Sequence, residues 1–248
     1  MFERSENMMD FTYDPGLVAL SIAVAILGSF TGLVLTSGIR RVRGLEATLR
    51  LVLGAVGIGG GVWSMHFIAM LAVQLPIPLS YDIPVTLISA VAAVIFTAGA
   101  VWTVAYEKLG KASLPVSAIV LGLGIATMHY LGMSAIRGCG LAYSKLGVAI
   151  SVLIAMQAAG VALWFAFHKR GVLDTLLGSV ALGLAIASMH YSGMEATRFV
   201  RGGTPFNLAE VLSEPLLAVA IATTLYTVCS ICLIVYAILT FAKPMRFN

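Results

Sequence analysis

The stretch GLGIATMHYLGM (residues 122–133) places a histidine between two methionines inside an otherwise apolar segment. Ionisable side chains are costly in lipid, and those found in membrane spans usually serve a function. The same pattern returns in GGGVWSMHFIAM (59–70) and GLAIASMHYSGM (183–194), so that 63 and then 61 residues separate successive histidines. The second and third copies share nine of these twelve residues. The chain is therefore built on an internal repeat of about sixty residues.

The composition around these copies indicates a membrane protein. Hydrophobic residues make up 60% of the 248 residues, charged residues 10%, and the mean hydropathy is +1.00. A soluble domain does not carry that much apolar surface. About 20 apolar residues cross a bilayer as a helix, and backbone groups in lipid must be bonded internally. We therefore expect an all-α bundle of seven transmembrane helices, at 15–38, 49–74, 85–106, 114–137, 146–167, 173–197 and 215–242.

The distribution of basic residues predicts the orientation of the bundle. Ten Lys and Arg residues follow spans 1, 3, 5 and 7, whereas five lie on the opposite side. The excess of positive charge marks the cytoplasmic side. We therefore expect 1–14 to be an extracytoplasmic segment, 15–242 the membrane domain and 243–248 a cytoplasmic tail. The net charge of +4 reports this topology and does not indicate binding of nucleic acid.

This topology also predicts that the three copies meet. Each sixty-residue interval is a pair of spans, so three helical hairpins follow span 1 and repeat about an axis along the membrane normal. The three histidines should then lie at one level, roughly 12–15 Å below the outer surface. Small residues let helices approach closely in lipid. Glycines precede each histidine by one to three turns, at Gly57, Gly59, Gly60, Gly61, Gly122, Gly124 and Gly183.

The motif Met-His-x-x-x-Met suits a soft metal ion. Residues four apart share a helix face, and imidazole and thioether donors together favour copper, above all Cu(I). Methionine is also a common core filler, and a lone membrane histidine often only bonds a neighbouring helix. Three copies in register favour a shared metal site. The predicted ligands are His66, His129 and His190 with Met65, Met70, Met128, Met133, Met189 and Met194.

Other candidate residues carry weaker signals. Cys229 and Cys232 form a Cys-x-x-Cys on one helix face and would suit copper, although buried cysteine is commonly inert. Tyr130 and Tyr191, with Phe67 at the matching place, either line the site or pack against lipid.

At these motifs the chain resembles the MHYT-domain family of bacterial membrane sensors. The resemblance covers all seven spans and implies an inner-membrane sensor whose motifs bind copper near the outer face and, through it, a diatomic gas such as O2, CO or NO. It maps the family's motif residues onto the nine ligands named above. The family's threonine is replaced by Ile68, Leu131 and Ser192, and its first tyrosine is Phe67.

The resemblance also implies a cytoplasmic output domain, such as a diguanylate cyclase or phosphodiesterase. The sequence stops at KPMRFN, so we expect either the sensor portion of a longer protein or a form that signals through a partner. An oligomer is compatible with either form. Two alternatives stay open: a redox enzyme or electron carrier using copper or haem, and a copper transporter.

Overall fold

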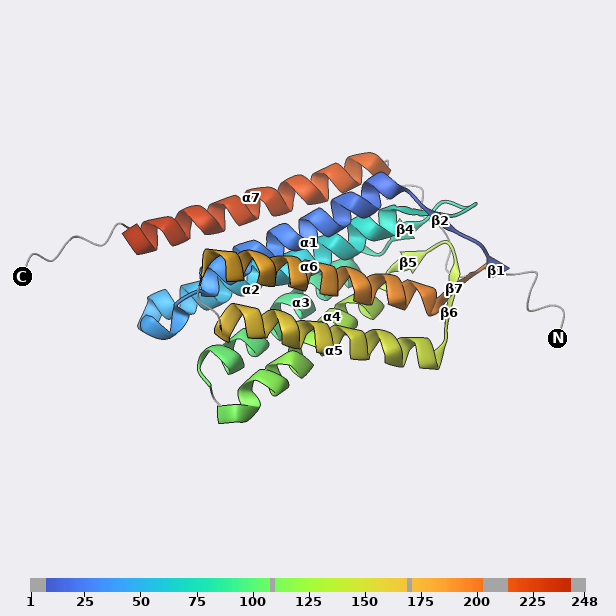
Figure 1. Cartoon of the computed structure of the whole chain (residues 1–248). Helices are drawn as coiled ribbons and strands as arrows, with labels where there is room; N and C mark the ends of the chain where they lie inside the picture. Colours follow the sequence, from blue (N-terminus) through green and yellow to red (C-terminus); the bar gives the residue numbers. More distant parts are fainter. Residues whose placement is uncertain (1–7, 108–109, 169–170, 203–213, 242–248) are drawn as a thin grey trace, which may run out of the picture.

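The structure is a computed structural model, and it describes residues 8–107, 110–168, 171–202 and 214–241. Within these residues the chain forms seven long helices that run roughly side by side (Figure 1). They are α1 (Pro15–Thr36), α2 (Gly44–Leu71), α3 (Ile83–Ala105), α4 (Ser113–Ser134), α5 (Lys145–His168), α6 (Val172–Glu195) and α7 (Glu214–Phe241). Short 3-10 turns, η1 (Ile39–Arg41) and η2 (Gly110–Ala112), lie at the end opposite the strands.

Each helix is long and apolar enough to cross a membrane, which confirms the predicted seven-helix class. The main difference in bounds is at α2, which begins at Gly44, about five residues before the predicted start. The charges in its first turns are accommodated because Arg50 bonds Glu46, one turn away, at 3.0 Å. The predicted terminal segments reach into residues 1–7 and 242–248, which lie outside the described residues.

The first six helices form a closed ring with two layers. Helices α2, α4 and α6, which carry the three motifs, contact one another at the centre. Helices α1, α3 and α5 pack outside them, each between two inner helices. Helix α7 lies beyond the ring against α1 and α2, at the edge of the bundle in Figure 1. The threefold arrangement is thus completed by α1, and α7 is an additional element.

Short strands close one end of the ring. The strands are β1 (Met8–Met9), β2 (Thr12–Tyr13), β3 (Val73–Gln74), β4 (Ser80–Tyr81), β5 (Ile136–Arg137), β6 (Gly140–Tyr143) and β7 (Thr197–Val200). The strand before each outer helix pairs with the strand after an inner helix, as β2 with β3, β4 with β5 and β6 with β7. Strand β1 adds to the outer edge of β7.

The same backbone hydrogen bond appears three times below this cap. Asp14, Asp82 and Ser144 precede the outer helices, and their N–H groups donate to the carbonyls of Ala72, Ala135 and Ala196 at 2.8 Å. The acceptor residues follow the inner helices directly. The packed hairpins are therefore α1–α2, α3–α4 and α5–α6, and the expectation that the three hairpins follow span 1 is wrong, because α1 packs with α2 and α7 lies outside the ring. This pairing fixes the ends of the three motif helices at one level.

Glycines bring the outer helices against the inner ones. A Cβ at Gly61 would lie 2.9 Å from the Cα of Gly28 in α1, and one at Gly183 would lie 2.9 Å from the Cα of Ile26. In α4, a Cβ at Gly122 would lie 2.5 Å from the Cα of Met156. The predicted close approach is present, and it joins inner helices to outer helices.

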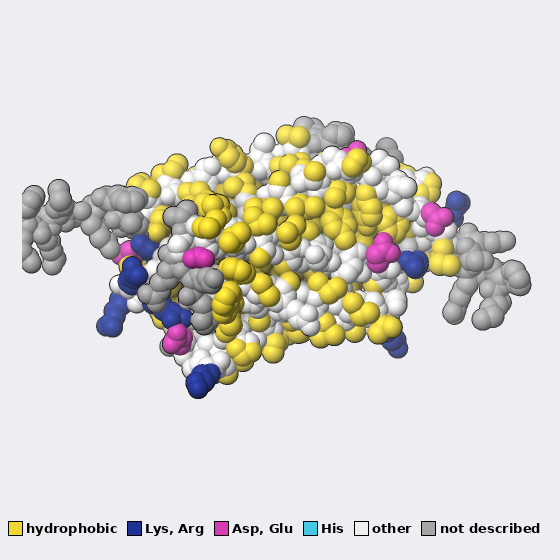
Figure 2. All heavy atoms as spheres, in the orientation of Figure 1, with side chains coloured by type: hydrophobic (Ala, Val, Ile, Leu, Met, Phe, Trp, Pro, Cys, Tyr) yellow, Lys and Arg dark blue, Asp and Glu magenta, His cyan; other side chains and the backbone are white. Residues whose placement is uncertain are grey.

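The exterior of the bundle suits a lipid bilayer. Figure 2 shows hydrophobic side chains over the middle of the molecule, with charged side chains gathered towards its two ends. On α3 the exposed residues include Leu87, Val91 and Ile95. Apolar side chains are stable on a surface that faces lipid, and polar ends are stable in water and headgroups. The chain is a multi-pass membrane protein.

Candidate metal centre

The three motif histidines meet on the axis of the ring. His66, His129 and His190 come from α2, α4 and α6, and each lies five residues before the end of its helix. Their side chains are buried, with exposed fractions of 0, 1 and 2%. The Nδ1 atom of His66 is 3.1 Å from that of His190 and 3.2 Å from that of His129, and the third distance is also 3.2 Å. The convergence predicted from the sequence is present.

Hydrogen bonds among these nitrogens cannot satisfy all three contacts at once. Each Nδ1 of a neutral imidazole carries either an N–H or a lone pair. Among three mutually adjacent nitrogens at least two must be alike, so one pair always sets lone pair against lone pair or N–H against N–H. A buried polar group without a partner costs about 1–3 kcal/mol. A cation removes the conflict because it accepts lone pairs from all three nitrogens.

The dimensions of the triangle fit a first-row metal ion. Its centre lies about 1.8 Å from each Nδ1, and metal–nitrogen bonds to zinc-sized ions are about 2.0–2.1 Å long. The three Nδ1 atoms would hold such an ion. Within the described residues, the convergent group of candidate ligand atoms consists of the three histidines alone, without a carboxylate or a thiol.

Two glycines make room for the imidazole rings. A Cβ at Gly132 in α4 would lie 2.4 Å from Nε2 of His66, and a Cβ at Gly193 in α6 would lie 2.6 Å from Nε2 of His129. Both glycines follow a motif histidine by three residues, so α4 and α6 each supply a gap for the ring of a neighbouring helix, whereas α2 carries Ala69 at the matching position. Among the described residues the three Nε2 atoms have no hydrogen-bond partner. Sequence reasoning missed these two glycines because it looked only at those that precede the histidines.

The six predicted methionines lie in two buried layers on either side of the histidines. Met65, Met128 and Met189 belong to the central hydrophobic cluster of the bundle. Met70, Met133 and Met194 belong to a second cluster beneath the strand cap. All six side chains are at most 1% exposed. The structure thus brings the nine predicted residues into adjacent layers, and the role of the methionines as ligands stays a prediction.

Tyrosines next to two of the histidines tie the inner helices to the outer ring. The ring of Tyr130 packs edge-on against His129, and its hydroxyl bonds Ser151 Oγ at 2.7 Å. Tyr191 packs in the same way against His190, and its hydroxyl lies 3.2 Å from Ser21 Oγ. These tyrosines therefore support the site instead of facing lipid.

The serines were missed, although a signal exists in the sequence. A serine follows each of three tyrosines by eight residues, in the pairs Tyr13 and Ser21, Tyr81 and Ser89, and Tyr143 and Ser151. Each pair stands at the start of an outer helix, so this is a second repeat in register with the first.

The α2 copy of the motif departs from this pattern. It carries Phe67 in place of tyrosine, so it has no hydroxyl to offer to the neighbouring outer helix. Trp63 instead donates its indole N–H to the carbonyl of Thr86 in α3 at 3.1 Å. All three inner helices are therefore hydrogen-bonded to an outer helix, but α2 uses a different side chain.

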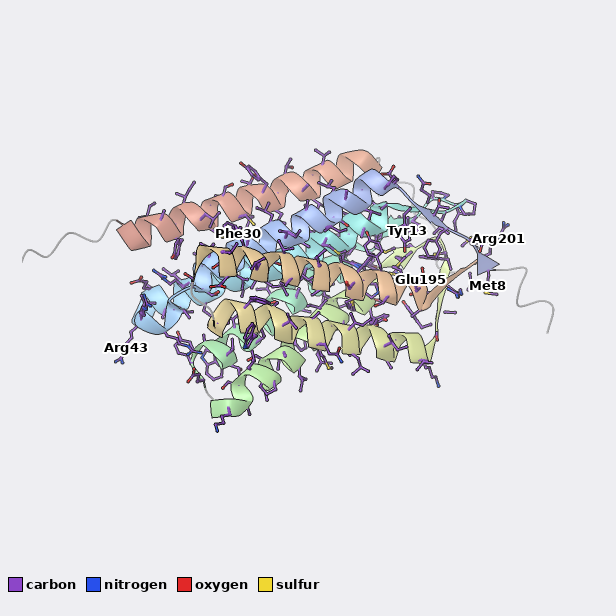
Figure 3. The ribbon with its side chains drawn as sticks, viewed as in Figure 1. Met8, Tyr13, Phe30, Arg43, Glu195 and Arg201 are labelled. Atoms are coloured by element: carbon purple, nitrogen blue, oxygen red, sulfur yellow. The ribbon has the colours of Figure 1, made fainter. Side chains whose placement is uncertain are left out.

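Three titratable side chains at the strand end, Cys139, Tyr143 and Tyr13, are neutral at physiological pH. Burial raises the pKa of the Cys139 thiol to about 11 and that of Tyr143 to about 12. Burial, followed by Tyr191 and Glu195, also raises the pKa of Tyr13. Figure 3 shows Tyr13 and Glu195 together at the strand end of the bundle.

The two cysteines of α7 lie apart from the histidine triangle. Cys229 and Cys232 are both free and buried. Cys229 packs with residues of α1 and α2 in a third hydrophobic cluster that includes Phe67.

Comparison with known proteins identifies the family. The family model described as "MHYT: Bacterial signalling protein N terminal repeat" matches residues 4–49, 59–116, 122–179 and 183–240. The chain belongs to the MHYT family. Three of the four matches begin at the first residue of a Met-His segment, which confirms the repeat found in the sequence. The first match contains α1 and no histidine.

The MHYT domain also resembles curated signalling proteins. The bifunctional diguanylate cyclase/cyclic di-GMP phosphodiesterase MucR of Pseudomonas aeruginosa is 40% identical over 234 residues, which cover 92% of this chain and 34% of MucR. The cyclic di-GMP phosphodiesterase NbdA of the same organism is 38% identical over 211 residues, covering 81% of this chain and 27% of NbdA. The signaling protein YkoW of Bacillus subtilis is 32% identical over 201 residues, which cover 78% of this chain and 25% of YkoW.

The chain therefore spans between a quarter and about a third of the length of these relatives. No solved structure matches it. The comparisons establish a bacterial membrane signalling domain, and they agree with the fold and the repeat described above.

Proposed function

We propose that this MHYT domain binds one copper ion through His66, His129 and His190 and reports its state to the cytoplasm. The observation that carries the proposal is the triangle of Nδ1 atoms, 3.1–3.2 Å apart and buried. Three imidazoles of this kind would hold the ion, with methionines from either layer completing the ligand set. Bound copper would supply a site for a diatomic gas such as O2, CO or NO, or a redox signal.

The donors and their surroundings favour Cu(I) over a divalent ion. All nine predicted ligands are neutral, so one ion leaves a single net charge in an apolar interior, and burying charge is costly. Thioether donors select soft ions, whereas carboxylates suit magnesium, calcium and manganese.

A haem-based redox function fits the geometry less well. The Nδ1 atoms lie only 3.1–3.2 Å from one another, which is too close for two of these histidines to hold one haem between them. An absorption spectrum of the purified protein tests this alternative, since haem gives an intense Soret band. Copper flux into proteoliposomes tests the transporter alternative.

The excess of basic residues supports an orientation with the strand cap outside and the C-terminus in the cytoplasm of a bacterial cell, in the inner membrane. The relatives MucR and NbdA bear names that concern cyclic di-GMP. We extend this to the present domain as a regulator of cyclic di-GMP turnover, through an output domain or a partner protein.

Helix α7 is positioned to respond to the state of the site. Phe67 packs edge-on against His66, with ring centroids 4.9 Å apart, and it shares a buried cluster with Leu225 of α7. Near the other end of α2, the Arg50 guanidinium lies over the ring of Tyr236 in α7, 4.8 Å from its centroid. A shift of α2 would therefore affect α7 at both ends. Signalling requires that the bound signal favours one helix arrangement over the other.

The deciding experiment measures copper in the purified domain. We expect about one copper per chain after anaerobic loading, with nitrogen ligands visible in X-ray absorption at the copper edge. Added CO should give an infrared C–O stretch only in the copper-loaded, reduced protein. Unchanged copper content in all three single histidine variants would rule out shared ligation, and a loaded site without a CO signal would rule out CO as its ligand.

A further inference from the structure

The histidine triangle is closed to solvent, so an ion must reach it through packed side chains. Beneath the strand cap lies a cluster of eight buried residues, Met9, Met70, Val73, Met133, Ile136, Cys139, Met194 and Phe199. Five of the eight carry sulfur, whereas the whole chain of 248 residues has only 11 methionines and three cysteines. Sulfur is therefore concentrated between the histidines and this end of the molecule.

The central hydrophobic cluster on the opposite side of the histidines contains sulfur only in its first layer. On that side the histidines meet Met65, Met128 and Met189, which belong to a cluster of 22 buried residues. The other members of that cluster are alanine, valine, leucine and isoleucine. A soft cation finds no further ligand there among the buried residues of the cluster. Of these two clusters of described residues, the one beneath the strand cap is therefore the richer in sulfur.

Strand β1 extends the sulfur groups to the surface. Met8 and Met9 pair with Val200 and Phe199 of β7. Successive side chains of a strand point to opposite faces, and accordingly Met8 is 49% exposed whereas Met9 is 6% exposed. Figure 3 shows Met8 at the outer edge of the strand cap. Thioethers are therefore present at the surface, within the cap and next to the histidines.

We propose that Met8, Met9 and Cys139, together with Met70, Met133 and Met194, form a transfer route along which Cu(I) reaches the histidine triangle from the strand end. The proposal rests on the proposed copper site. Soft sulfur donors bind Cu(I), and a series of neutral donors lets the ion exchange one weak ligand set for the next without meeting a fixed counter-charge. Met9 is the first buried donor on this route, and its role is transfer instead of final ligation.

The test compares two conservative variants of the full chain in lipid nanodiscs. Met9→Leu removes the buried thioether of the route. Met156→Leu is the matched control, since it removes a partly buried thioether of α5 that lies on the outer ring against Gly122. Methionine-to-leucine changes nearly conserve volume, so both variants should fold. The metal-free proteins are mixed anaerobically with Cu(I) held by a chromogenic chelator, and the loss of the chelate colour gives the loading rate.

We expect Met9→Leu to slow loading at least about tenfold, with the final copper content and affinity unchanged, and Met156→Leu to load like the wild type. A wild-type loading rate in Met9→Leu overturns the route. A loss of equilibrium affinity in Met9→Leu also overturns it, because Met9 would then be a ligand.

A second measurement separates this proposal from the copper site itself. In protein labelled with ¹³C-methyl methionine, Ag(I) serves as a redox-inert soft probe. The Met9 methyl signal should shift during a titration of the His190→Asn variant, whose triangle is incomplete. Absence of that shift contradicts the route, whereas a wild-type chain that takes up no Cu(I) contradicts the proposed function.

Discussion

The substitution Gly132→Ala tests the geometry of the site with a single methyl group. The added Cβ would lie 2.4 Å from Nε2 and 2.8 Å from Cδ2 of His66. Non-bonded heavy atoms prefer separations of about 3.5 Å or more, so the imidazole must move by about 1 Å. Ligand distances in metal sites hold to within about 0.2 Å, so this shift removes His66 from the triangle. We expect copper affinity to fall at least about 10–100-fold.

The same methyl group should cost about 1–3 kcal/mol of stability through overpacking. Gly99→Ala is the control, because its Cβ would lie 3.9 Å from Val120 Cγ1, an ordinary contact. In a helix interior that change gains up to about 1 kcal/mol. Copper bound in competition with a Cu(I) chelator and thermal unfolding followed by circular dichroism provide the two readouts.

A third variant, Gly193→Ala, places a Cβ 2.6 Å from Nε2 of His129 and should reproduce the loss. The reasoning is refuted if folded Gly132→Ala and Gly193→Ala proteins bind copper as tightly as Gly99→Ala does.

Three further predictions address the remaining contacts. His190→Asn should lose most of its copper while retaining its helical content, as measured by mass spectrometry and circular dichroism; full copper content would show that two imidazoles suffice. Tyr130→Phe removes the hydroxyl that bonds Ser151 and should lower the unfolding free energy by about 1 kcal/mol with copper content unchanged; a loss of copper would instead make the hydroxyl part of the site. The bond from the Val85 N–H, and then Arg137, hold the pKa of Asp82 below its ordinary value of 3.8, so its stabilising effect is present above pH 3.8 and is lost as pH falls through the folded value. Thermal unfolding between pH 2 and 6 should show this acid loss in the wild type and a smaller one in Asp82→Asn; equal losses would argue against a stabilising role of the Asp82 carboxylate.

The helices and the meeting of the histidines could be predicted from the sequence for clear physical reasons. A bilayer requires long apolar helices, so hydropathy reveals the spans. Parallel copies of one motif at one depth then place the three imidazoles at the same level. The repeat carried this prediction, since a single copy around His129 would be equally compatible with a packed, hydrogen-bonded side chain.

Other features depend on contacts between distant segments and could not be predicted in this way. Hydropathy does not tell which helix closes the ring, because α1 and α7 are both apolar and both border the motif helices. The strand pairs are only two to four residues long, which is too short for an alternating pattern to show. The gaps at Gly132 and Gly193 become evident only when the ring of the next histidine is in place.

The six-helix ring departs from threefold symmetry at α2. Tyrosines tie α4 and α6 to their outer neighbours through serine hydroxyls, whereas α2 carries Phe67 at that position and uses Trp63 for its bond to α3. The additional helix α7 packs on this side of the ring, against α1 and α2. Contraction or expansion of the histidine triangle would move three similar helices, but α2 alone among them shares the Phe67 cluster and the Arg50 contact with α7. Under the proposed signalling function, a movement of α2 at the histidine triangle would therefore be passed to α7, which leads to the C-terminus.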